Sequence, residues 1–190
     1  MKFKTHGAII QNVNLLAVSL SQNESKLTKG VIIIMKIRKA TEKDTPKIGE
    51  LLVQVLNVHN EVRPDIFHKD SRKYSDAELC VMMSDESTPI FVAVDENDSV
   101  LGYAMCQIKT QIGSSILKDM KTLYIDDICV DQQMRGQHVG KTLFEYVKAY
   151  ARQIGCDNIT LNVWADNLNA YKFYQKLGLK DQRHVMELKL

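Results

Sequence analysis

A segment near the middle of the chain combines two features that bind phosphate groups, a glycine-containing turn and a helix start. Residues 130–143 read VDQQMRGQHVGKTL and follow an apolar, strand-like stretch. A helix that begins after such a turn directs free backbone N–H groups and its positive dipole end at one point, which favours phosphate. Arg135 and Lys141 add positive charge, and Gly136 and Gly140 let the backbone approach a ligand closely.

Two kinds of phosphate site fit this segment. Residues 136–142, GQHVGKT, approach the P-loop pattern of nucleotide hydrolases. They are one residue short between the glycines, and no matching acidic strand motif stands at a suitable position, which disfavours that interpretation. The other kind holds the pyrophosphate of coenzyme A, and it depends on a second motif downstream.

Two adjacent carboxylates, Asp126 and Asp127, interrupt the apolar strand that leads into the turn. Acids in such surroundings are rare unless they are paired or functional. Because side chains alternate along a strand, we predict that these two point to opposite faces of the sheet. Either could take a proton from a reacting group.

The second motif, VWADNLNAYKFYQKLGL, occupies residues 163–179. Its Asn-x-x-Ala-x-x-Phe-Tyr-x-x-x-Gly pattern, together with Arg-Gly-x-x-Val-Gly in the turn, resembles the two hallmarks of the GNAT family of N-acetyltransferases. The resemblance covers Met35 to Leu190. It implies an acyltransferase that moves an acetyl group from acetyl-CoA, its co-substrate, to a primary amine by direct attack, with no metal.

The resemblance also implies roles for individual residues. Tyr174 matches the general acid of the departing thiolate, Asp126 matches a general base of polyamine acetyltransferases, acting directly or through water, and Asp127 becomes a substrate contact or structural acid. The implied cofactor-binding residues come from the strand edge, the turn and the start of the last helix: Ile128, Cys129, Val130, Arg135, Gly136, Gln137, His138, Val139, Gly140, Lys141 and Asn167.

Some of these residues also allow plainer explanations. Tyr174 could pack in the core with its hydroxyl at the rim, Asn167 could only cap a helix, and Cys129 could be a core thiol. His138 departs from the family pattern, which has glycine there, so its Cβ could crowd the pyrophosphate. That departure supports the alternative function, a non-catalytic coenzyme A-binding sensor or partner module.

The periodicity of apolar residues predicts the elements that position these groups. The expected fold is a mixed α/β (α+β) domain, with a mostly antiparallel sheet flanked by helices in the order β-α-α-β-β-β-α-β-α-β. Thr41 and the capping box Ser75–Glu78 begin two helices, and Gly155 and Gly178 end two others. The predicted strands are residues 35–40, 90–94, 100–108, 123–130, 159–164 and 184–190.

The first 34 residues differ from the rest, and we expect an N-terminal extension (1–34) followed by an N-acetyltransferase domain (35–190). The apolar run 8–20 is interrupted by polar residues and lacks a cleavage site, which disfavours a signal peptide. The codons of residues 29–31 can spell a ribosome-binding sequence before Met35. Translated upstream sequence is therefore one explanation, and an ordinary extension that adds a strand or packs on the surface is the other.

Composition narrows the remaining function classes. The chain has 190 residues and a formal net charge of +2, with 45% hydrophobic and 25% charged residues, which is typical of one globular domain. This mixed charge gives no reason to expect nucleic acid or a membrane as partner. Four cysteines without CxxC spacing and five scattered histidines predict reduced thiols, a cytoplasmic location and no metal site. Analogy with the family suggests a homodimer, and the amine acceptor stays open.

Overall fold

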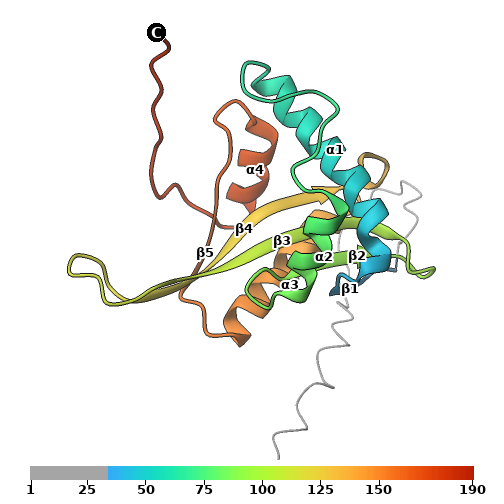
Figure 1. Cartoon of the computed structure of the whole chain (residues 1–190), viewed down its shortest axis with the longest axis horizontal. Helices are drawn as coiled ribbons and strands as arrows, with labels where there is room; N and C mark the ends of the chain where they lie inside the picture. The colour runs from blue at the N-terminus through green and yellow to red at the C-terminus, as the bar shows by residue number, and fades with distance from the viewer. Residues whose placement is uncertain (1–33) are drawn as a thin grey trace, which may run out of the picture. The chain divides into compact units, whose positions relative to one another are not determined.

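The computed structural model describes residues 34–190, which belong to a single unit of the chain. Nearly all of the extension expected at 1–34 therefore lies outside the described residues. Within them, the chain forms a first strand, two helices, three consecutive antiparallel strands and a closing α-β-α segment (Figure 1).

A five-stranded sheet in the order β1-β2-β3-β4-β5 forms the centre of this unit. Its strands are β1 (Lys36–Lys39), β2 (Ile90–Val94), β3 (Val100–Gln111), β4 (Met120–Val130) and β5 (Asn158–Leu161). The first four pair antiparallel, and only β4 and β5 run parallel, joined by a helical crossover. The fold class predicted from the sequence is confirmed.

Helices cover both faces of the sheet and divide the core into two clusters. Side chains of α1 (Thr45–Val62) and α2 (Asp76–Ser84) pack with Tyr103, Met105 and Cys129 on one face. Side chains of α3 (Val139–Gln153) pack on the other face with Cys106, Leu123 and Ile125. The last helix, α4 (Leu168–Lys176), follows β5. A strand residue that packs in the first cluster therefore lies on the α1–α2 face of the sheet, and one that packs in the second lies on the α3 face.

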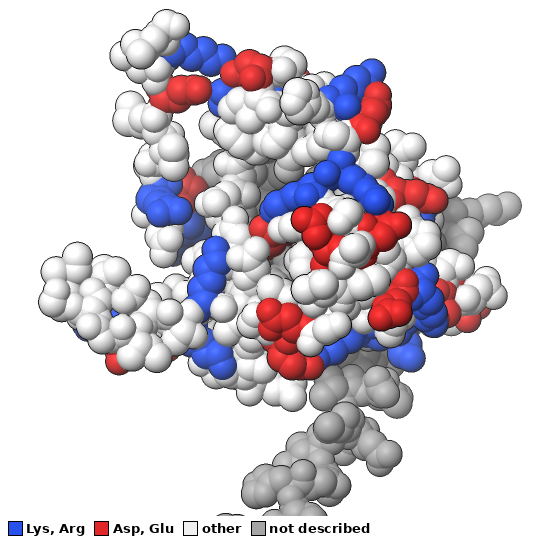
Figure 2. Space-filling model, viewed as in Figure 1, with Lys and Arg blue, Asp and Glu red and all other residues white. Residues whose placement is uncertain are grey.

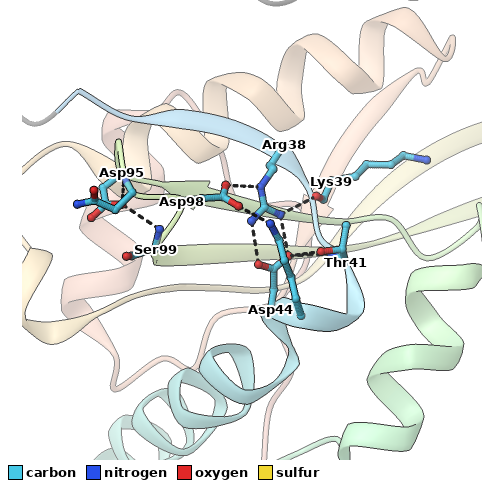
Figure 3. A network of polar contacts seen from close by, with 9 residues as sticks. Arg38, Lys39, Thr41, Asp44, Asp95, Asp98 and Ser99 are labelled. Carbon is cyan, nitrogen blue, oxygen red and sulfur yellow. Dashed lines mark hydrogen bonds and ion pairs between the residues drawn. The ribbon is translucent and has the colours of Figure 1, made fainter.

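A buried ion pair fixes the start of α1 against the sheet. Arg38 of β1 donates two hydrogen bonds to the carboxylate of Asp44, at 2.7 and 2.8 Å, and a third to Asp98 in the β2–β3 turn at 2.9 Å (Figure 3). Burial opposes the ionisation of Asp44, but the bonds from Arg38 and Thr41 outweigh it and hold its pKa below the usual value. Pro46 then occupies the first turn of α1, where its missing N–H costs nothing.

The final predicted strand, residues 184–190, does not form. Everything after Lys176 lacks helix or strand, and Val185, Met186 and Leu188 are exposed. Alternating apolar residues make a strand only where a neighbouring edge accepts their backbone hydrogen bonds. Here the segment is instead held by ion pairs of Glu187 with Arg63 and of Lys189 with Asp65. Figure 2 shows basic and acidic side chains side by side on this face of the molecule. The predicted strand 159–164 is also shorter, since β5 ends at Leu161.

Candidate active site

A β-bulge in β4 places the two adjacent acids. Met105 pairs with Asp127 across the β3–β4 ladder, whereas the next residue, Cys106, pairs with Ile125. Asp126 is therefore the extra residue of β4, with no partner on β3. A bulge of this kind leaves one residue unpaired and redirects its side chain.

The bulge corrects our prediction that the two carboxylates point to opposite faces. Asp127 bonds to Tyr103, which belongs to the α1–α2 side of the core. Asp126 bonds to Tyr74, which packs against the same cluster. Alternation fails here because it holds only for an unbroken ladder, so both acids serve one side of the sheet.

Asp127 is a partly buried carboxyl whose ionisation is disfavoured. Burial raises its pKa to about 6, and the charge of Asp126 adds to this, while hydrogen bonds and the charge of Lys73 act in the opposite direction. Its Oδ2 accepts a hydrogen bond from the hydroxyl of Tyr103 at 2.6 Å. A carboxylate with a pKa near neutrality is suited to general base catalysis.

Asp126 lies in an ion pair with a lysine of the loop between α1 and α2. Lys73 Nζ donates to both carboxylate oxygens, at 2.8 and 2.7 Å, and the hydroxyl of Tyr74 donates to Oδ2 at 2.8 Å. The side chain of Asp126 is only 7% exposed, and that of Lys73 is 47% exposed. Asp126 thus already binds an alkyl ammonium group at the open side of the site.

Tyr174 of α4 lies within electrostatic reach of Asp127. Burial raises its pKa above the usual value, and the negative charge of Asp127 raises it further. The phenol therefore keeps its proton at neutral pH and can donate it. Asn167 begins the same helix as its N-cap, since its side chain accepts from the N–H of Ala170 at 3.1 Å.

The second half of β4 has an open edge toward β5. The parallel pairing joins residues 122–125 of β4 to 158–161 of β5 and ends at the pair Ile125–Leu161. Beyond it, the β5-facing backbone of Ile128, Cys129 and Val130 has no strand neighbour among residues 34–190. Such an edge can bind an extended ligand through its N–H and C=O groups.

Cys129 has the properties of a core thiol. Its Sγ donates to the carbonyl of Leu51 at 3.4 Å, and burial raises its pKa to about 12. The thiolate form needed for nucleophilic attack is therefore scarce at neutral pH. If Cys129 contributes to ligand binding, it does so through its backbone N–H and C=O groups.

The predicted phosphate-binding turn joins β4 to α3. It contains a short helical turn (Gln132–Met134), then Arg135 and Gly136, whose φ is +80°, before α3 begins at Val139. Arg135, His138 and Lys141 are exposed, and Gln137 is partly buried. The first amides of α3 have no partner within the helix, so they remain available to an anion.

His138 adopts the backbone conformation that a glycine would supply. As N-cap of α3 it has φ 62° and ψ 6°, in the left-handed region. Histidine tolerates this region better than most residues, at a cost of about 1 kcal/mol. The backbone of the turn therefore follows the path that glycine would give it. This weakens the argument from His138 for a non-catalytic coenzyme A-binding module.

Gly140 marks a close approach between α3 and α4. A Cβ placed there would lie 3.3 Å from Cζ of Phe173 and 3.4 Å from Cγ2 of Val130. Helix α3, which begins at the predicted phosphate-binding turn, thus packs directly against the helix that carries Tyr174. The two motifs of the sequence meet at this contact, which fits a ligand that spans both.

Three residues of the site were missed from the sequence: Lys73, Tyr74 and Tyr103. The first two lie in a loop more than fifty residues before Asp126 and show no motif. Tyr103 lies in an apolar strand and is buried. Because a buried phenol usually forms a hydrogen bond, its position in that strand was the one signal that pointed to a polar partner nearby.

Two cavities of the described residues lie away from the candidate catalytic residues. One of about 570 Å³ is lined by β1 and the β2–β3 turn, including Arg38 and Asp98, and contains none of the candidate catalytic residues. Among residues 34–190, no group of three or more His, Cys, Asp or Glu side chains could hold a metal ion. No helix in that range is long and apolar enough to cross a membrane.

Comparison with known proteins identifies this arrangement. The profile of the Acetyltransferase (GNAT) family matches residues 52–179. The chain belongs to this family. The GNAT assignment makes it an acyltransferase that moves an acetyl group to an amine, with acetyl-CoA as the donor that the family uses. It replaces the P-loop interpretation of the turn.

Curated relatives and solved structures agree with the GNAT assignment. The peptidyl-lysine N-acetyltransferase YjaB of Salmonella typhimurium is 25% identical over 78% of this chain and 85% of its own. The glucosamine 6-phosphate N-acetyltransferase of Arabidopsis thaliana is 25% identical over 77% of this chain and 91% of its own. A mutant of the BH1408 protein of Bacillus halodurans superposes with a TM-score of 0.78 and 31% identity, covering 82% of this chain and 99% of that one.

Proposed function

We propose that the protein acetylates a cationic primary amine by direct attack on acetyl-CoA, at the β4 bulge. The observation that carries this proposal is that Asp126 and Asp127 serve one side of the sheet while Tyr174 lies within electrostatic reach of Asp127. The charge of Asp127 contributes to the raised pKa of Tyr174, and the charge of Asp126 contributes to that of Asp127. A proton acceptor and a proton donor therefore lie within electrostatic reach of each other.

Residues of the turn and of the open strand edge would hold acetyl-CoA. The amides from Gly136 to Lys141 suit the pyrophosphate, with Arg135 and Lys141 supplying positive charge. The free edge of Ile128, Cys129 and Val130 suits the extended pantetheine arm, and Asn167 can contact that arm while capping α4. Acetyl-CoA supplies the activated acyl group, and these residues position it.

The two acids divide the work on the acceptor amine. Asp126 binds the ammonium, a role that its ion pair with the alkyl ammonium of Lys73 supports. Asp127 is suited to accept the proton near neutral pH, because burial raises its pKa to about 6. The sequence pointed to Asp126 as the base, and we now propose that the amine's proton passes to the pair, with Asp127 controlling the pH dependence.

Tyr174 protonates the departing thiolate. Its raised pKa keeps the phenol neutral, which a general acid requires. Because no step needs a Lewis acid, we assign no role to a metal.

Charge narrows the class of acceptor. Two neighbouring acids favour a positively charged amine over a neutral one. One relative acts on peptidyl-lysine and another on glucosamine 6-phosphate, and only the first of these presents an alkyl ammonium like that of Lys73. We therefore place lysine side chains and polyamines ahead of amino sugars.

We further propose that the enzyme is a cytoplasmic homodimer. Its four cysteines are unpaired, as in reducing compartments. The outer edge of β5 has no strand neighbour among residues 34–190, while residues 184–190 alternate apolar side chains that are exposed. The segment 184–190 of a second copy would satisfy both, since an exposed edge and an unpaired strand pair readily.

Calorimetric titration of acetyl-CoA, with ATP as control, tests the donor site first. We expect saturable binding of acetyl-CoA alone. Release of coenzyme A is then measured with spermidine, a lysine peptide and glucosamine 6-phosphate. Turnover should be greatest with the first two, whereas tight donor binding without turnover of any amine would favour the non-catalytic sensor.

A further inference from the structure

Lys73 occupies the place at Asp126 that an acceptor amine would take. Its Nζ lies 2.8 and 2.7 Å from the two carboxylate oxygens and 5.1 Å from the ring centroid of Tyr74, whose hydroxyl donates to the same carboxylate. Among the ion pairs of residues 34–190, this is the one in which a lysine contacts a candidate catalytic acid. The ε-ammonium of lysine is chemically a cationic primary amine, the acceptor class proposed above.

Lys73 is placed so that it can react as well as bind. It belongs to the loop between α1 and α2, not to a rigid element, and its side chain is half exposed. It faces Asp126 and Asp127 from β4, Tyr74 from its own loop and His59 from α1. Burial lowers the pKa of His59, and the positive charge of Lys73 lowers it further. The amine is thus enclosed on the sheet side and open to solvent on the other.

We propose that Lys73 is an acetylation site of the enzyme itself, modified in its own active site by acetyl-CoA. The inference rests on the proposed function, because it uses the same acid and the same donor. It adds an acceptor that belongs to the chain.

The reaction balances with the groups at hand. Lys73 Nζ gives a proton to Asp126 and attacks the thioester carbonyl carbon, so that a C–N bond forms while the C–S bond breaks. The thiolate leaves with a proton from Tyr174. The nitrogen loses two protons in total. The one that Asp126 accepts passes on to solvent, and the other restores the proton that Tyr174 gave up. The products are an Nε-acetyl-lysine and free coenzyme A.

Acetylation would change the site in a defined way. The amide of acetyl-lysine carries no charge, so the ion pair with Asp126 is lost. Asp126 is then free to bind an external ammonium without displacing Lys73. Modification of Lys73 therefore opens the acceptor position.

The test is incubation of the full-length protein with acetyl-CoA in the absence of amine, followed by peptide mapping. Lys69 is a matched control, because it is an exposed lysine of the same loop and reports uncatalysed acetylation. General acid–base catalysis predicts that Lys73 gains its acetyl group roughly a hundredfold faster than Lys69. The rate should not depend on protein concentration, and Asp126→Asn should reduce it to that of Lys69.

Equal rates at Lys73 and Lys69 would overturn the proposal, and this comparison needs no variant to fold. Parallel assays of coenzyme A release with spermidine separate the two levels of inference. Turnover of spermidine with an unmodified Lys73 removes only the self-acetylation. If protein that binds acetyl-CoA neither acetylates Lys73 nor turns over spermidine, the proposed function is overturned as well.

Discussion

The hydroxyl of Tyr103 donates a hydrogen bond of 2.6 Å to Oδ2 of Asp127, across the β3–β4 ladder on the α1–α2 side of the sheet. The hydroxyl of the buried Tyr103 needs a hydrogen-bond partner. That partner is the carboxyl of Asp127, whose pKa burial raises to about 6. This pair joins the hydrophobic core to the chemistry of the site. Stability and catalysis therefore make opposite demands on Asp127.

Replacing Asp127 with asparagine should stabilise the protein at neutral pH. Burial raises the pKa of Asp127 from 3.8 to about 6, so the folded chain holds this proton more tightly than the unfolded chain. Stability is consequently lost as pH rises from about 4 to 6. Asp127→Asn removes that loss, which we expect to be about 1–3 kcal/mol at pH 7.5. Urea denaturation at pH 4 and pH 7.5 should show the gain only at the higher pH.

The pH dependence of turnover should separate the two acids. In the wild type, kcat/KM should fall below about pH 6, because protonated Asp127 accepts no further proton. Asp126→Asn should retain that limb while the KM for a cationic amine rises. Asp127→Asn should lose the limb and roughly 10²–10⁴-fold of its rate. A limb that survives in Asp127→Asn would assign the base role elsewhere.

Replacing His138 with glycine should relieve backbone strain in the phosphate-binding turn. The left-handed conformation of His138 disfavours any residue with a Cβ, and relief should add about 1 kcal/mol to the free energy of unfolding. Because the path of the turn is already glycine-like, affinity for acetyl-CoA should change by less than about tenfold, or ~1.4 kcal/mol. His138→Ala is the control, since it removes the imidazole but keeps the strain. Equal stability of both variants would argue against strain at this position.

Deleting residues 184–190 should convert the proposed homodimer to a monomer. Light scattering coupled to size-exclusion chromatography measures this directly. Glu187→Gln serves as control, because it breaks the ion pair with Arg63 but leaves the alternating apolar residues intact. A wild-type monomer, or a truncated chain that remains a dimer, would contradict strand exchange through β5.

Local signals in the sequence predicted most elements of the fold. Strand β2 was predicted with its observed bounds, since Pro89 precedes it and turn residues follow it. The capping box of Ser75 and Glu78 forms as expected at the start of α2. Both features depend on residues within a few positions of each other, which a single sequence displays.

Features that depend on distant partners were not predictable in this way. The bulge at Asp126 arises from a mismatch of one residue between β3 and β4, and neither strand alone reveals it. Lys73 reaches Asp126 from a loop without periodicity. The segment 184–190 has the pattern of a strand, but pattern alone does not supply an edge to pair with. The sequence motifs located the candidate site, whereas the pKa shifts and ion pairs within it could be determined only from the folded structure.

The change from antiparallel to parallel pairing at β4 also bears on how the chain folds. Strands β2, β3 and β4 are joined by short connections and pair with sequence neighbours, so they can assemble early. Strand β5 pairs over only four residues, after the α3 crossover, and α4 with Tyr174 follows it. We expect this C-terminal portion to be ordered last and to open first. A donor molecule that bridges α3 and α4 would then act as a clamp on the weakest part of the chain, and would protect the enzyme against heat and proteolysis while it is bound.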